Sequence, residues 1–259
     1  MPELRALLIA LAAMALLAAL GWTSSLAKRD VSIVDSLWSL FFLLGALVYA
    51  GFAAVTGSRA MLLLALVALW ALRLAAHLTW RNWGEPEDRR YRAIRARNEP
   101  GFAWKSLYLV FGLQALLAWV IAMPLFAGLS GATPLNAIDY AGAGLWVFGF
   151  GFEALGDWQL ARFKADHANH SKVLDSGLWR YTRHPNYFGE AVLWWGYFLI
   201  ALAAGGGWTV FAPVLMTLLL LKVSGVALLE KDIGERRPEY GAYIARTNAF
   251  IPGPPKASA

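Results

Sequence analysis

Seven long apolar segments alternate with short polar segments along this chain of 259 residues. Each segment approaches the roughly 20 residues that an α-helix needs to cross the hydrocarbon layer of a bilayer. They lie at residues 5–26, 33–55, 60–80, 105–128, 136–160, 187–206 and 209–229. The pattern therefore predicts an all-α, polytopic membrane protein with about seven transmembrane helices, which form a single integral membrane domain over residues 1–259.

The composition supports the same class of protein. Hydrophobic residues make up 59% of the chain and charged residues 15%, with a mean hydropathy of +0.50, whereas soluble domains carry about 25% charged residues. Thirteen tryptophans are typical of a protein with many side chains at the membrane–water interface. The chain has no cysteine, which excludes disulfides, thiol catalysis and cysteine-bound metal. The first apolar segment lacks a basic leader and is long for a signal peptide, so we expect a retained helix.

Basic residues are distributed asymmetrically between the two ends of the predicted helices. Nineteen of the 23 lysines and arginines fall in the segments that follow the first, third, fifth and seventh helices, which lie on one side of the membrane. Because basic residues accumulate on the cytoplasmic side, this asymmetry places the N-terminus outside and the C-terminus in the cytoplasm. It also explains the net charge of +6 through topology and contact with anionic lipid, without a nucleic-acid partner.

Strongly polar residues inside the apolar segments all fall in the predicted cytoplasmic half. They are Asp35 in the second helix, Arg73 and His77 in the third, Glu153 and Asp157 in the fifth, Asn186 and Glu190 in a stripe with Trp194 in the sixth, and Lys222 and Glu230 in the seventh. Intramembrane polar groups are costly unless they serve a site, so their shared depth predicts one polar cavity open to the cytoplasm. Two plainer interpretations stay open: Arg73 snorkels to the surface, or Asp35 and Arg73 form a structural ion pair.

The segment between Glu153 and Glu190 is rich in cations and aromatic residues. Its polar members include Gln159, Arg162, Lys164, Asn169, Lys172, Arg180 and Arg183. Cations beside tryptophan and tyrosine suit a ligand that carries phosphates and aromatic rings. The number of cations favours NADPH over S-adenosylmethionine, which has no phosphate, and a basic loop that only faces lipid is the alternative. Nearby His167 and His170 lack a third convincing ligand, so we predict no metal site.

The stretch Gly177–Glu190, with Trp194-Trp195-Gly196 after it, resembles the signature of the steroid 5α-reductase superfamily. That superfamily includes Δ14-sterol reductases and is related in fold to the isoprenylcysteine carboxyl methyltransferases. More closely, the chain is similar nearly from end to end to a bacterial branch of oxidoreductases of unknown function. The matching segments are 32–38, 69–74, 87–91, 157–164, 224–231, 240–243 and 246–252.

The resemblance implies a seven-helix fold in the plasma membrane of a bacterium, with NADPH bound by residues 136–259 and a hydrophobic substrate among the helices of residues 1–128. The positions that match cofactor contacts are Glu153, Asp157, Lys164, Arg180, Tyr181, His184, Asn186, Glu190, Trp194, Tyr240, Tyr243 and Arg246. The family's reductases grip the substrate carbonyl with an acid and a tyrosine from early helices. Here the acid is expected to be Asp35, and His77 is expected in the tyrosine's place.

These residues predict an NADPH-dependent reductase of a carbon–carbon double bond conjugated to a carbonyl, in a steroid-like or lipid substrate. Hydride passes to the β-carbon, and His77, oriented by Asp35, donates to the enolate oxygen while Arg73 adds positive charge. Two other classes stay open. One is a methyltransferase that uses S-adenosylmethionine on a lipid or prenyl-like acceptor, and the other is a non-catalytic lipid-binding membrane protein.

Overall fold

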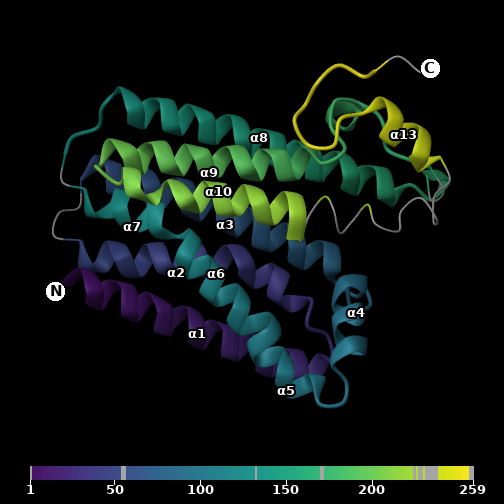
Figure 1. The fold of residues 1–259 in the computed structure, drawn as a ribbon, viewed down its shortest axis with the longest axis horizontal. Coiled ribbons are helices and arrows are strands. Elements are labelled where there is room, and N and C mark those ends of the chain that lie inside the picture. Colours follow the sequence, from purple (N-terminus) through teal and green to yellow (C-terminus); the bar gives the residue numbers. More distant parts are fainter. Residues whose placement is uncertain are drawn as a thin grey trace. The chain divides into compact units, whose positions relative to one another are not determined.

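The structure, a computed structural model, describes residues 2–53, 57–131, 133–169, 172–223, 226, 230 and 239–256. Within these residues the chain forms helices and no strand, which confirms the all-α class (Figure 1). The chain divides into two compact units. Unit 1 consists of Met1–Asn136 and Ile200–Thr209, and unit 2 consists of Ala137–Leu199 and Val210–Ala259.

Unit 1 contains the first four predicted transmembrane helices. Its elements are α1 (Pro2–Lys28), α2 (Ile33–Phe52), α3 (Ser58–Asn82), α4 (Arg89–Asn98), α5 (Phe102–Ser106), the π-helical η1 (Leu107–Gly112), α6 (Leu113–Ile121) and α7 (Met123–Ser130). Four stretches are long and apolar enough to cross a membrane, namely Glu3–Lys28, Ile33–Phe52, Ser58–Asn82 and Phe102–Ser130. These helices make the chain an integral membrane protein, as predicted.

Aromatic side chains form much of the core of unit 1. Phe42 of α2 lies between Trp38, one turn before it, and Trp70 of α3, with ring centroids 5.1 and 5.6 Å apart. Further along α2, Tyr49 contacts Phe126 of α7 at 5.2 Å. Since apolar residues recur on several faces of α2, this helix can pack against α1, α3, α6 and α7 at once. It is therefore the central helix of the unit.

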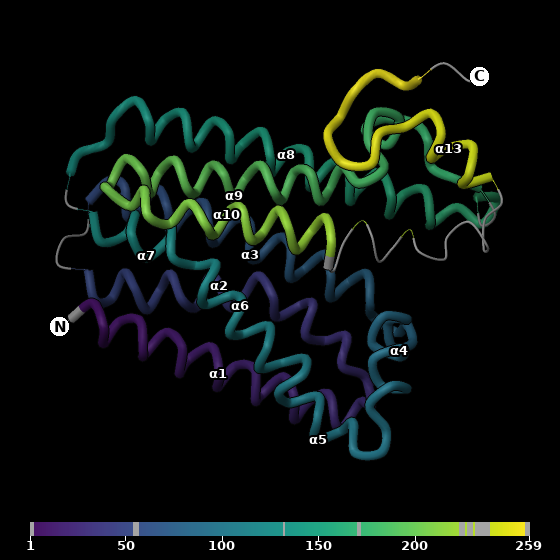
Figure 2. The backbone as a smooth tube through the Cα atoms, in the orientation of Figure 1, coloured from purple at the N-terminus to yellow at the C-terminus, as the bar shows by residue number. Residues whose placement is uncertain are grey.

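Unit 2 is built on two long helices, α8 (Ala137–Ala165) and α9 (Pro185–Ala203), which run side by side in Figures 1 and 2. The other elements of this half of the chain are η2 (His167–Asn169), η3 (Gly177–Arg180), η4 (Gly207–Val210), α10 (Phe211–Leu218), η5 (Leu219–Val223) and α13 (Tyr240–Arg246). The helices predicted at 136–160 and 187–206 are thus present. The one predicted at 209–229 is helical through Val223, and residues 224–225 and 227–229 lie outside the described part of the chain.

The long helices of unit 2 are not among the candidate membrane spans. These spans do not include α8 or α9, and Gly207–Lys222 is apolar but shorter than a span. Acidic residues contribute to this result, since Glu153 and Asp157 lie in α8 and Glu190 lies in α9. The structure therefore supports four spans, and the seven-span topology stays a prediction.

Glycines let α8 and α9 approach each other closely. A Cβ atom on Gly149 of α8 would lie 2.6 Å from the carbonyl oxygen of Gly189 in α9. Seven residues further along α9, a Cβ atom on Gly196 would lie 2.7 Å from the carbonyl oxygen of Gly142 in α8. Larger side chains at these positions would force the backbones apart. The glycine-rich stretch of α8 thus serves helix packing, whereas Gly151 in the same stretch has open space around it.

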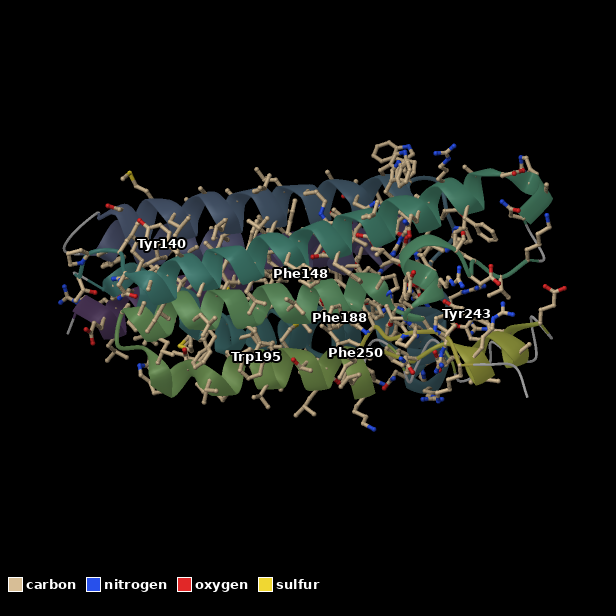
Figure 3. All side chains as sticks on the ribbon, turned by 90° about the horizontal axis from the view of Figure 1, so that it is seen from above. Tyr140, Phe148, Phe188, Trp195, Tyr243 and Phe250 are labelled. Atoms are coloured by element: carbon tan, nitrogen blue, oxygen red, sulfur yellow. The ribbon has the colours of Figure 1, made fainter. Side chains whose placement is uncertain are left out.

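The C-terminal segment of unit 2 folds back onto the turn that precedes α9, as the yellow part of the tube in Figure 2 shows. The backbone nitrogen of Arg183 donates to the carbonyl of Asn248 at 2.9 Å, and that of Gly253 donates to the carbonyl of Tyr181 at 3.1 Å. Phe188 and Phe250, labelled next to each other in Figure 3, contact with ring centroids 5.9 Å apart. These contacts hold in place the turn before α9, where the sequence of unit 2 is most polar.

Candidate active site

The carboxylate of Asp35, in the first turn of α2, is held by two side chains of α4. Its Oδ1 accepts a hydrogen bond from the Tyr91 hydroxyl at 2.5 Å, and its Oδ2 accepts one from Arg90 Nη2 at 2.7 Å. Gln114 of α6 donates to the Tyr91 oxygen at 3.1 Å. These four residues form one connected polar group in a largely apolar unit, and we name them the Asp35 cluster.

The local sequence explains how α4 presents these side chains. Asp88 is the N-cap of α4, and its carboxylate accepts hydrogen bonds from the backbone nitrogen of Arg90 at 2.8 Å and from Arg90 Nε at 3.0 Å. The backbone nitrogen of Asp88 donates to Ser32 Oγ at 2.8 Å, which ties the start of α4 to the start of α2. Tyr91 follows and is only 6% exposed. The cap therefore orients both residues of α4 that bind Asp35.

The charges in the cluster keep the phenol of Tyr91 protonated. Burial and the negative charge of Asp35 raise the pKa of Tyr91 well above its ordinary value, against the opposing effect of Arg90. Burial opposes the charge of Arg90, but the nearby carboxylates of Asp35 and Asp88 raise the pKa of the guanidinium. The cluster thus combines a hydroxyl donor with a fixed positive charge, which suits the stabilisation of negative charge on an oxygen atom.

Arg73 and His77 lie one turn apart on α3, and both are partly buried. The ring of His77 lies beside that of Trp80, with centroids 6.1 Å apart. The hydrogen bonds that hold the Asp35 carboxylate come from Tyr91 and Arg90 of α4. The pairing expected from sequence between Asp35 and His77 or Arg73 stays a prediction.

In unit 2, the predicted acidic residues are buried where α8 and α9 meet. Glu153 is 2% exposed and Glu190 is 8% exposed. Asp157 is also buried, and its Oδ1 accepts a hydrogen bond from Asn186 Nδ2 at 3.0 Å. Trp194 is fully buried. The four-residue spacings on both helices thus turn these side chains into the unit, as the sequence predicts.

Arg183 and His184, in the turn before α9, both hold the carboxylate of Glu230. Arg183 Nε and Nη2 donate to its two oxygens at 2.7 and 2.9 Å, and His184 Nε2 lies 2.9 Å from Oε1. Arg183 Nη1 also donates to the carbonyl of Thr247 at 2.5 Å. We name these four residues the Glu230 clamp. Burial alone would raise the pKa of Glu230, but the hydrogen bonds from His184 and Arg183 and the Arg183 charge lower it to about 2.

Three of the residues matched to cofactor contacts face outward. Lys164 at the end of α8, Arg180 at the end of η3 and the ring of Tyr181 are all exposed. Two residues before Lys164, the guanidinium of Arg162 lies 5.5 Å from the ring centroid of the exposed Trp158. This end of α8 and the segment after it therefore offer cations and aromatic rings to a ligand in the solvent.

Other matched residues are bonded inside unit 2. Tyr243 is buried and its hydroxyl donates to the carbonyl of Trp179 in η3 (Figure 3). Tyr240 is also buried and contacts Tyr243, with ring centroids 5.4 Å apart. Arg246 forms an ion pair with Asp175, in the segment that leads to η3. These contacts hold α13 against η3.

With this geometry in place, the comparisons with known proteins identify the family. The chain matches the family described as protein of unknown function, DUF1295, over residues 21–247. The chain belongs to this family. It is also similar to the uncharacterized protein C594.04c of Schizosaccharomyces pombe, with 26% identity over 267 aligned residues that cover 89% of this chain and 75% of the relative. No solved structure matches the chain significantly. The Asp35 cluster and the Glu230 clamp lie within the range that matches DUF1295.

Sequence reasoning placed Asp35 at the site but missed Tyr91. A signal was present, because Asp88 is a favoured N-cap residue and predicts a helix in which Tyr91 falls in the first turn. In that turn, tyrosine is the one aromatic residue among arginines, which favours burial of its ring. Gln114 of α6 bonds a residue of another helix, since its partner is Tyr91 of α4.

The structure describes His167 of the linker but not His170. No group of three or more histidine, aspartate or glutamate side chains in that part of the chain is placed to hold a metal ion. His167 belongs to η2.

Proposed function

We propose that this protein is an NADPH-dependent membrane reductase that saturates a carbon–carbon double bond conjugated to a carbonyl in a hydrophobic, steroid-like or lipid substrate. The Asp35 cluster carries the proposal, because it joins a buried, protonated phenol to a carboxylate and a guanidinium at the end of apolar helices. Such a donor suits an oxygen atom that becomes an enolate. Membership of the steroid 5α-reductase superfamily, proposed from Gly177–Glu190, agrees with this chemistry.

The donor set of unit 2 fits the parts of NADPH. Lys164 and Arg180 are exposed cations that suit phosphate groups, and Tyr181 offers an exposed ring for an aromatic base. Asn186 and the buried Glu190 offer a donor and an acceptor for amide or hydroxyl groups. The residues bonded inside the unit, His184 and Tyr243 among them, shape the backbone around this set.

The Asp35 cluster performs the oxygen chemistry in this proposal. When bound, NADPH would supply the hydride for the β-carbon of the substrate, and a proton from solvent would complete the saturated ketone at the α-carbon. The Tyr91 hydroxyl donates to the substrate carbonyl, whose oxygen gains negative charge during the reaction. Asp35 then keeps its bond to Arg90, and Gln114 keeps the phenol oxygen in place. Burial of the Tyr91 ring, which is 6% exposed, limits the access of water to its hydroxyl and strengthens these hydrogen bonds. Tyr91 thus takes the role that the sequence suggested for His77.

The proposed topology has seven spans, with the N-terminus outside and the C-terminus in the cytoplasm of a bacterium. The placement of nineteen of the 23 lysines and arginines supports it. The two polar groups support it as well. Asp35 lies in the first turn of α2, and Arg183 and His184 directly precede α9, so both groups lie at predicted cytoplasmic ends. A soluble cofactor reaches that side.

The experiment is a turnover assay on the purified full-length protein in nanodiscs. Steroidal and linear hydrophobic enones are offered with NADPH that carries deuterium on C4 of the nicotinamide, and products are analysed by mass spectrometry. The expected result is a saturated ketone with one deuterium at the β-carbon and one NADPH consumed per product. A parallel reaction contains S-adenosylmethionine and prenyl-like acceptors. Methyl transfer there, with no reduction of any enone, would overturn the proposal in favour of a methyltransferase.

A further inference from the structure

The arginines of α4 differ in their exposure and in their partners. Arg90 pairs with Asp35, and Arg95 donates to the two carboxylate oxygens of Glu87 at 2.9 and 2.7 Å. Arg92 and Arg97 are exposed. The exposed arginines of α4 therefore present positive charge to the surroundings.

Exposed tryptophans mark the level of α4 relative to a membrane. Trp80 and Trp83, at the end of α3, are 65% and 79% exposed, and Trp104 in α5 is 70% exposed. Both helices lead into stretches that are long and apolar enough to cross a bilayer, Ser58–Asn82 and Phe102–Ser130. Exposed tryptophan at the end of an apolar helix lies at the level of lipid headgroups. α4 connects these two ends and is therefore at headgroup level.

A small cavity opens between α4 and the ends of α1 and α5. Its volume is about 60 Å³, and its lining includes Leu26, Arg29, Arg95, Phe102 and Ala103. The guanidinium of Arg95 lies over the ring of Phe102, 4.6 Å from its centroid. The side chains of Leu26 and Arg29 are exposed at the same place. The space equals on the order of two water molecules, enough for a short piece of chain.

We propose that this surface binds an anionic phospholipid of the bilayer. The phosphate lies against Arg29 and Arg92, and the adjoining glycerol or acyl segment enters the cavity beside Phe102. The chains then continue along the exposed apolar faces of α1 and α5, which include Leu26 and Trp104. The bilayer, and not a free anion in solution, is the source of the ligand, because the cations adjoin a cavity and apolar surface at headgroup level.

The acidic residues nearby leave the surface cationic. Glu87 is bound by Arg95 and by the backbone nitrogen of Val31 at 3.0 Å, and its pKa is lowered because these hydrogen bonds outweigh the effect of burial. Asp30 accepts a hydrogen bond from the backbone nitrogen of Ser32 at 2.8 Å, and the exposed Glu99 accepts one from the backbone nitrogen of Phe102 at 3.5 Å. Against these, the exposed basic residues at the ends of α1 and α4 are Lys28, Arg29, Arg92 and Arg97. Charge complementarity therefore favours an anionic over a zwitterionic headgroup.

Native mass spectrometry of the full-length protein tests this proposal without any assumption about the reaction. The delipidated protein in detergent is titrated with phosphatidylglycerol or with phosphatidylcholine. Phosphatidylglycerol is expected to bind more tightly, and the double variant Arg29→Gln/Arg92→Gln should bind it about 25-fold more weakly, since each basic residue near an anionic lipid contributes roughly fivefold. The matched control Arg5→Gln/Lys222→Gln removes two exposed charges elsewhere and should bind as the wild type does.

A third variant separates the cavity from the charge. Ala103→Leu fills the cavity at an exposed position without changing any charge, and it should weaken phosphatidylglycerol binding while its unfolding temperature in detergent alone stays that of the wild type. Equal binding of both lipids, unchanged binding by the double variant or by Ala103→Leu, or displacement of the lipid by millimolar inorganic phosphate would each overturn the proposal.

Discussion

The Asp35 cluster and the Glu230 clamp contain similar side chains, but the two arrangements suit different roles. In each, a carboxylate is held by an arginine and by a second side chain, Tyr91 or His184. The clamp arginine binds both carboxylate oxygens and a backbone carbonyl, so it joins two segments of chain. The cluster joins side chains of three helices, and its hydroxyl can exchange one acceptor for another. An arginine that binds both carboxylate oxygens and a backbone carbonyl holds the backbone in place. A hydroxyl that can change its hydrogen-bond acceptor suits catalysis instead.

Removal of the clamp arginine should have the largest effect on folding. Arg183→Met leaves the partly buried carboxylate of Glu230 without its bidentate partner and should cost about 3–5 kcal/mol of unfolding free energy. Chemical unfolding in detergent, followed by circular dichroism, measures this loss. Arg180→Met is the control, since Arg180 is exposed only three residues earlier. Equal stability of the two variants would mean that the clamp does not hold the unit together.

Removal of the cluster hydroxyl should instead affect turnover. Tyr91→Phe keeps the ring in the core and removes the donor, so kcat for enone reduction should fall about 10²–10³-fold, as on loss of one oxyanion donor. The affinity for NADPH should not change. His77→Phe is the matched variant on α3 and should keep most of the activity. Full turnover by Tyr91→Phe with loss of turnover in His77→Phe would return the donor role to the histidine.

Acid should weaken the clamp at a defined pH. The pKa of Glu230 is lowered from 4.5 to about 2 in the folded state, so its contribution is complete above pH 4.5 and disappears as the pH falls toward 2. Glu230→Gln should therefore flatten the dependence of unfolding free energy on pH in that window by about 2–3 kcal/mol. Denaturant midpoints at several pH values measure the slope. Glu99→Gln, at an exposed carboxylate, should follow the wild type.

The smallest expected effect concerns the packing of α8 against α9. Gly189→Ala places a methyl group against the backbone of α8 and should cost about 1–3 kcal/mol of stability through overpacking. Gly151→Ala meets open space and should be neutral or stabilising by up to about 1 kcal/mol. Thermal unfolding of the two variants side by side tests the contact. Similar melting temperatures would show that α8 and α9 do not need this approach.

The helices were predictable from sequence because each is a long apolar run with its own local signal. The four spans of unit 1 follow the predicted segments closely. The shared face of Glu153 with Asp157, and of Asn186 with Glu190, was also predictable, since residues four apart on a helix share a face.

The partners of the polar residues were not predictable in the same way. Asp35 binds residues 55 and 56 positions later, in a short polar helix that has no apolar periodicity. Sequence reasoning therefore paired Asp35 with His77, whose depth in a neighbouring apolar helix could be estimated. Glu230 was recognised as a polar residue near the end of the last predicted helix. Its hydrogen bonds to Arg183 and His184 depend on the folding back of the C-terminal segment. No local sequence pattern predicts that the segment folds back.

The proposed function depends most directly on which cofactor the protein binds. Equilibrium titration of the purified protein with NADPH and with S-adenosylmethionine, followed by fluorescence or calorimetry, decides the point. The account predicts saturable binding of NADPH that weakens in Arg180→Gln, with no binding of S-adenosylmethionine. Saturable binding of S-adenosylmethionine alone would contradict the account and would indicate a methyltransferase.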